Sequence, residues 1–111
     1  MGDDEVLLVY VTAASEDEAK RIGRALVEER LAACVNVFAP HTAIYRWKGA
    51  LEESAESAFL AKTTRARLPA LMARVRALSS YTLPAIVALP ASGGDAEFLA
   101  WVKVETSDPV A

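Results

Sequence analysis

The fold is decided by a stretch that begins with VLLVYV, residues 6–11, and continues into SEDE, residues 15–18. The first segment is apolar without alternation, which is typical of a β-strand buried on both faces. The second segment is a capping box, with Ser15 as the N-cap and Glu18 three residues later. Apolar residues then recur at helical spacing as far as Val27. We therefore expect a buried strand followed by an amphipathic helix.

Residues 33–63 predict one long, interrupted β-hairpin. Segments 35–39 and 42–47 favour an extended conformation, with a break at Pro40. Lys48-Gly49 is suited to a tight turn, because glycine supplies the positive φ that hairpin turns need. The returning arm runs to about Thr63, and side chains alternate in character near its end.

The last third of the chain predicts a helix, a short strand and a final helix. Apolar residues from Leu68 to Leu78 fall on one helical face, and Pro69 lies near the helix start, where its missing N–H costs little. Residues 86–89 form a short strand, and Gly93-Gly94-Asp95 leads into the last helix. The order βαββαβ with an added C-terminal helix predicts an α/β (α+β) protein of ferredoxin-like fold. We expect a single domain, 1–111, with an ordered core of about 5–106.

The apolar first strand also predicts a homo-oligomer. In a two-layer ferredoxin-like fold the helices cover one face of the sheet only. A strand that is apolar toward both faces would leave a large apolar surface exposed, which is unusual in a monomer. We expect the appended helix to cover part of the second face and copies of the chain to cover the rest. The long hairpin also offers edge backbone groups for pairing between subunits.

Composition excludes several classes of protein. Twelve Lys and Arg against fifteen Asp and Glu give a net charge of −3, without the broad basic surface of a nucleic-acid binder. No window approaches eighteen uninterrupted apolar residues, so no membrane span is expected. Residues 1–5 are acidic where a secretory signal would be basic, and the single cysteine fits a reducing compartment. We expect a cytoplasmic protein.

Few side chains suggest chemistry, and no catalytic constellation is visible. His41, the only histidine, is expected to be an exposed strand or loop residue. Cys34 is either a small buried hydrophobe or a soft thiolate ligand for copper, which would need further ligands or further subunits. Lys62 lies among apolar neighbours, where it would hold an anion or bridge to a carboxylate. Tyr45 and Trp47 are expected to pack between strands.

Two further points concern reactivity. Glu52, Glu53 and Glu56 make an acidic cluster on the returning arm, whose default interpretation is a charged strand surface. Nucleophilic catalysis by Lys62 or Cys34 is the weakest alternative, because no base stands within sequence reach of either. We therefore expect a protein that is not an enzyme.

Several segments, taken in order, resemble the CutA family of divalent-cation tolerance proteins. They are ERLAACVNV at 29–37, TAIYRWKG at 42–49, YTLPAI at 81–86 and FLAW at 98–101. The resemblance covers the chain from about Val6 to Thr106. It implies a ferredoxin-like subunit in a packed homotrimer, tolerance to divalent metals, copper above all, and no established enzymatic reaction.

The resemblance also implies a site between subunits. The matching residues of this inter-subunit cleft are Cys34, Tyr45, Trp47, Glu56, Lys62 and Tyr81, with Cys34 as the metal ligand. A trimer similar to the PII signalling proteins gives the alternative, a signalling or scaffold trimer that binds a small ligand or a protein partner at these clefts. In residues 79–85 the chain lacks a histidine and two carboxylates that relatives usually show, so a site that depends on them is not carried over.

Overall fold

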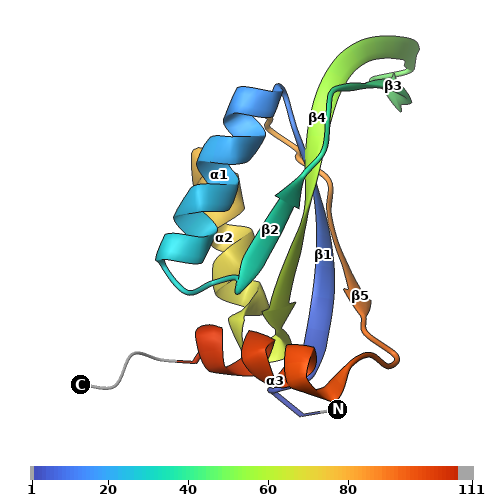
Figure 1. Cartoon of the computed structure of the whole chain (residues 1–111). Coiled ribbons are helices and arrows are strands. Elements are labelled where there is room, and N and C mark those ends of the chain that lie inside the picture. Colours follow the sequence, from blue (N-terminus) through green and yellow to red (C-terminus); the bar gives the residue numbers. More distant parts are fainter. Residues whose placement is uncertain (1, 108–111) are drawn as a thin grey trace.

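The computed structural model describes residues 2–107; Met1 and residues 108–111, the ends of the expected domain, lie outside that range. The predicted order of elements and the α/β fold class are confirmed (Figure 1). No helix among residues 2–107 is long and apolar enough to cross a membrane. The elements are β1 (Val6–Ala13), α1 (Glu16–Glu28), β2 (Cys34–Val37), β3 (His41–Trp47), β4 (Ala50–Thr64), a 3-10 turn (Arg65–Arg67), α2 (Leu68–Leu78), β5 (Ile86–Pro90) and α3 (Ala96–Glu105).

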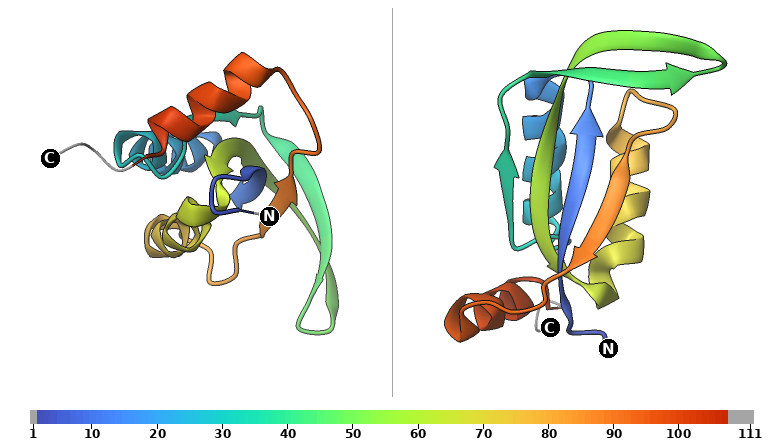
Figure 2. Two further views of the ribbon diagram at one scale, coloured as in Figure 1. Left: turned by 90° about the horizontal axis from the view of Figure 1, so that it is seen from below. Right: turned by 90° about the vertical axis from the view of Figure 1, so that its right-hand side faces the viewer.

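The strands form an antiparallel sheet in the order β2-β4-β1-β5, and β3 pairs with the first half of β4. Helices α1 and α2 lie on one face of this sheet, as Figure 1 and Figure 2 show from three directions. The core fills the space between these two layers. Its fully buried members include Leu7, Val9, Val11, Ile22, Leu26, Phe59, Leu71 and Val75.

Helix α1 begins at the predicted cap, with one change in the bonding. The Ser15 hydroxyl accepts a hydrogen bond from Glu18 N at 3.1 Å, as in a capping box. The Glu18 carboxylate, however, does not bond the N-cap N–H. It accepts from Ala14 N at 2.8 Å and from Ser80 N at 2.9 Å. The same carboxylate therefore caps α1 and anchors the segment that follows α2.

The predicted hairpin is present, and a bulge divides it. Its tip is a two-residue turn in which Lys48 and Gly49 both have positive φ, 50° and 84°. Val37 pairs with Phe59, whereas the next pair joins His41 to Glu56. Residues 38–40 therefore oppose only 57–58, and one extra residue bends the hairpin. The outer part, β3 with the start of β4, swings across the top of the sheet (Figure 2).

The second face of the sheet is only partly covered. Helix α3 closes one end, where Val102 packs against Val6 and Ala33. Farther along, Val87 and Leu89 of β5 remain 51% and 49% exposed. The strand registers place eight side chains on this surface, which we call the open face: Leu8, Tyr10, Cys34, Asn36, Leu60, Lys62, Val87 and Leu89.

Candidate functional site

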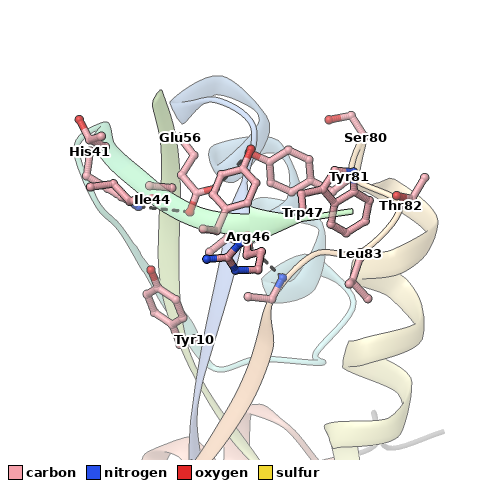
Figure 3. A pocket seen from close by; sticks show the side chains of 15 residues that line it. Tyr10, His41, Ile44, Arg46, Trp47, Glu56, Ser80, Tyr81, Thr82 and Leu83 are labelled. Carbon is pink, nitrogen blue, oxygen red and sulfur yellow. Dashed lines mark hydrogen bonds and ion pairs between the residues drawn. The ribbon is translucent and has the colours of Figure 1, made fainter. Parts of the chain in front are cut away.

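A hollow lies between the bent hairpin and the segment 80–85 (Figure 3). We call it the hairpin cleft. Its volume is about 790 Å³, which is within the range of small-molecule sites. Its walls come from β1, β3, β4 and the 80–85 segment. The lining includes four aromatic side chains and several polar or charged ones: Tyr10, Tyr45, Trp47 and Tyr81 with His41, Arg46 and Glu56.

Glu56 is the centre of a hydrogen-bond network in this cleft. The Tyr81 hydroxyl donates to Glu56 Oε1 at 3.1 Å, and His41 Nε2 lies 3.4 Å from Glu56 Oε2. The Glu56 side chain is only 12% exposed. Burial, followed by the hydrogen bond to Glu56, raises the pKa of Tyr81 to about 12. The phenol therefore stays protonated and acts as a donor throughout the physiological range.

Tyr81 is placed by backbone anchors on both sides of it. Ser80 N donates to the Glu18 carboxylate at 2.9 Å, and Tyr81 N donates to the Ser79 hydroxyl at 3.0 Å. Farther along, Ala85 N donates to the Thr12 hydroxyl at 3.0 Å. The segment is thus tied to α1 and β1, and Tyr81 reaches Glu56 from a fixed position.

The Glu18 carboxylate that anchors this segment is ionised despite its burial. Burial alone would raise its pKa, but hydrogen bonds from Ala14 and Ser80 and the charge of Arg21 outweigh this and hold the pKa below its usual value of 4.5. The Arg21 contribution is a longer contact of 3.6 Å from an exposed side chain. The hydrogen bonds from Ala14 and Ser80 are therefore the main reason that the charged form is stable.

Arg46 is the one charged group of the cleft without a partner among the described residues. Because side chains alternate along a strand, it projects from the opposite side of β3 to Tyr45 and Trp47. In the view of Figure 3 its guanidinium is drawn between the side chains of Tyr10 and Leu83, and all three residues line the cleft. This part of the cleft combines an available positive charge with aromatic and aliphatic walls.

The six residues predicted for one cleft fall into two places. Tyr45, Trp47, Glu56 and Tyr81 line the hairpin cleft. Cys34 and Lys62 instead are cross-strand neighbours on the open face. Six positions along β4 separate Lys62 from Glu56, which is about 20 Å at the rise of a strand.

Lys62 and Cys34 have neighbours that differ from those expected. The Lys62 ammonium donates to the Asn36 side-chain oxygen, an amide rather than the carboxylate considered from the sequence. Cys34 is half-buried, with this lysine opposite it. The ammonium is unfavourable beside a bound metal cation. Among residues 2–107 no group of three or more His, Cys, Asp or Glu side chains could hold a metal ion. The donors of one chain therefore do not fit a copper site around Cys34.

The acidic cluster predicted on the returning arm also separates. Glu52 pairs with Tyr45 and Glu56 with His41, so both lie on one side of the hairpin. Glu53 is adjacent to Glu52 in the strand and points to the other side.

Two residues of the cleft were missed by reasoning from the sequence. His41 was expected to be an exposed strand or loop residue, and it is half-buried and lies beside Glu56. Arg46 was not singled out. A signal was available, because a two-residue turn at Lys48-Gly49 pairs Trp47 with Ala50 and, by counting outward, His41 with Glu56. The position of Arg46 depends on the bend of the hairpin, which counting does not give.

Comparisons with known proteins agree with the fold. The sequence model of the CutA1 divalent ion tolerance protein family matches residues 7–105. The divalent-cation tolerance protein CutA of Thermus thermophilus is 50% identical over 99 residues, which is 89% of this chain and 96% of that protein. Protein CutA of Homo sapiens is 43% identical over 101 residues, or 91% of this chain. That stretch is 56% of the human protein, so this chain spans little more than half of its length.

Solved structures give the same result. The Thermus thermophilus divalent cation tolerance protein superimposes with a TM-score of 0.90 at 48% identity, covering 92% of this chain and 99% of that one. CutA1 of Oryza sativa gives a TM-score of 0.90 at 34% identity, with 95% and 96% coverage. With nearly all of its length matched by the family and by relatives well above 30% identity, the chain belongs to the CutA1 family of divalent ion tolerance proteins.

Proposed function

We propose that this protein acts in divalent-cation tolerance as a cytoplasmic homotrimer that binds copper or another divalent ion weakly between subunits. Family membership supports the role in tolerance. The open face supports the assembly, since Val87 and Leu89 remain half-exposed beside Leu8 and Leu60. A second copy would bury these side chains, and each buried apolar side chain contributes about 1.5–3 kcal/mol.

The position of Cys34 carries the metal part of the proposal. Its thiol lies on the open face, the surface that another copy is proposed to cover. One thiol binds a soft metal weakly, so further donors must come from other subunits. His41 and Glu56 offer a second, separate pair of donors in the hairpin cleft. A copper site at Cys34 would be lost on replacing Cys34, whereas a site in the hairpin cleft would be lost on replacing His41.

Native mass spectrometry with and without Cu(II) tests both parts. We expect trimers that hold a stoichiometric number of copper ions, and we expect Cys34→Ser to lose them. His41→Gln is the matched control, because it removes a different metal-binding side chain and leaves the thiol. Copper lost in His41→Gln but kept in Cys34→Ser would move the site to the hairpin cleft. Monomers would remove the assembly on which the proposal depends.

A second candidate function is a PII-like signalling or scaffold role, in which the assembly binds a small ligand or a protein partner. The volume and aromatic lining of the hairpin cleft favour it. A ligand that binds only the native state raises the melting temperature, so a thermal-shift screen of organic anions and nucleotides would test this role. The absence of any shift across such a screen would count against it.

A further inference from the structure

We propose that the hairpin cleft binds a planar aromatic anion, with its charged group on Arg46 and its ring against Tyr10 and Leu83. The proposal rests on the second candidate function and names the chemical class of its ligand. It does not use Lys62, which was expected to hold an anion, because Lys62 lies about 20 Å along β4 from Glu56, the hydrogen-bond partner of Tyr81.

The charges of the cleft favour an anion over a cation. Glu56 is nearly buried, and its two oxygens already face the Tyr81 hydroxyl and the His41 ring. Arg46 has no partner among residues 2–107, and its side chain is exposed. A cationic ligand would meet this guanidinium and find both Glu56 oxygens engaged. A carboxylate would instead make a bidentate, charge-assisted pair with Arg46.

The shape and lining of the cleft favour a flat ring. The volume of about 790 Å³ accommodates a two-ring molecule in an open site. The Tyr10 ring and the Leu83 side chain line the same cleft as Arg46, and Leu83 is 64% exposed. Covering these surfaces gives an apolar contribution next to the ionic one. The Thr82 hydroxyl, also in the lining, adds a polar group at the rim.

Isothermal titration calorimetry with three matched probes tests the charge preference. The probes are naphthalene-2-carboxylate, the neutral naphthalene-2-carboxamide and the cationic 2-naphthylmethylamine. We expect saturable binding of the carboxylate, with the amide and the amine at least about tenfold weaker. Equal affinity for the carboxylate and the amide would overturn the proposal, and so would the absence of carboxylate binding at millimolar concentration. The latter is also the result expected if another copy of the chain fills the cleft.

Variants test whether Arg46 holds the anion. Arg46→Gln is expected to weaken carboxylate binding by about tenfold to a hundredfold and to leave the amide unchanged. Arg46→Lys keeps the charge without the planar fork and should give a smaller loss. Arg24→Gln is the matched control, since Arg24 is an exposed arginine on α1 outside the cleft. An equal loss in Arg24→Gln and Arg46→Gln would refute a specific contact and indicate a general effect of net charge.

Two further measurements keep the outcomes separate. Circular dichroism and a melting curve for each variant establish that it is folded. Native mass spectrometry on the same samples gives the oligomeric state. A trimer that binds no carboxylate overturns this inference and leaves the proposed assembly standing. A monomer that binds the carboxylate through Arg46 supports this inference and overturns the proposed assembly.

Discussion

Replacing Glu18 by glutamine is expected to destabilise the protein by about 3 kcal/mol near neutral pH. The carboxylate accepts one hydrogen bond from Ala14 N and one from Ser80 N, at 2.8 and 2.9 Å, in a residue that is 6% exposed. An amide has one acceptor oxygen, so one of the two N–H groups would face an NH₂ group. Hydrogen bonds to a buried charge contribute about 1.5–3 kcal/mol each, and an unsatisfied buried donor adds a further penalty. The exposed Arg21 contact adds little.

The pH dependence gives this prediction a second readout. The pKa of Glu18 is lowered in the folded protein, below its usual value of 4.5. Its stabilising contribution is therefore complete above about pH 4.5 and is lost as the pH falls through the folded-state pKa. The free-energy difference between the wild type and Glu18→Gln should accordingly shrink as the pH is lowered below the folded-state pKa, where the wild-type carboxyl is also neutral.

Urea denaturation followed by far-UV circular dichroism measures both effects at one fixed protein concentration, because assembly makes stability depend on concentration. Glu16→Gln is the matched control. Glu16 is in the same helical turn, but its side chain is 42% exposed and its contact to Lys20 is 3.4 Å, so the change should cost less than about 0.5 kcal/mol. A Glu18→Gln protein within about 0.5 kcal/mol of wild type would refute the reasoning. A large difference that persists unchanged in acid would refute the electrostatic part of it.

Three further predictions concern single side chains. Tyr81→Phe should lower the free energy of unfolding by about 1 kcal/mol. It should also remove, from a spectrophotometric titration, the tyrosine that ionises near pH 12. The stability that the protonated phenol provides is present below pH 10.0 and is lost as the pH rises through about 12. Gly23→Ala should cost about 1–3 kcal/mol in urea, since the new Cβ would lie 2.9 Å from Val35 Cγ1, and adding Val35→Ala should recover part of the loss. Gly49→Ala, at a φ of 84°, should cost about 1–2 kcal/mol in the same assay, and a neutral result would mean that the turn can change its conformation.

Local rules in the sequence predicted the elements well because each element has its own start or stop signal. Ser15 caps α1, the Lys48-Gly49 turn closes the hairpin, and Asp95 caps α3 by accepting from Phe98 N at 2.9 Å. These signals act within a few residues of the chain. They therefore remain visible without any knowledge of tertiary contacts.

The candidate site was harder to predict because it depends on a bend. Glu56 and Tyr81 were both singled out, but their contact requires the segment after α2 to be held by Glu18. Lys62 was grouped with them, although it lies beyond the bulge on the other part of β4. The extra residue at 38–40 decides which side chains meet, and Pro40 alone indicates a break without its direction.

The single strand β4 crosses two environments, and its amide hydrogens should exchange with solvent at very different rates. Before the bulge, residues 50–56 are exposed or half-buried and pair only with β3. From Ser57 onward most residues are buried, and β4 has a strand on each side. Local opening of the hairpin tip therefore costs little free energy, while residues 57–64 remain paired with their neighbouring strands. If copies of the chain cover the tip, its protection against exchange becomes dependent on protein concentration.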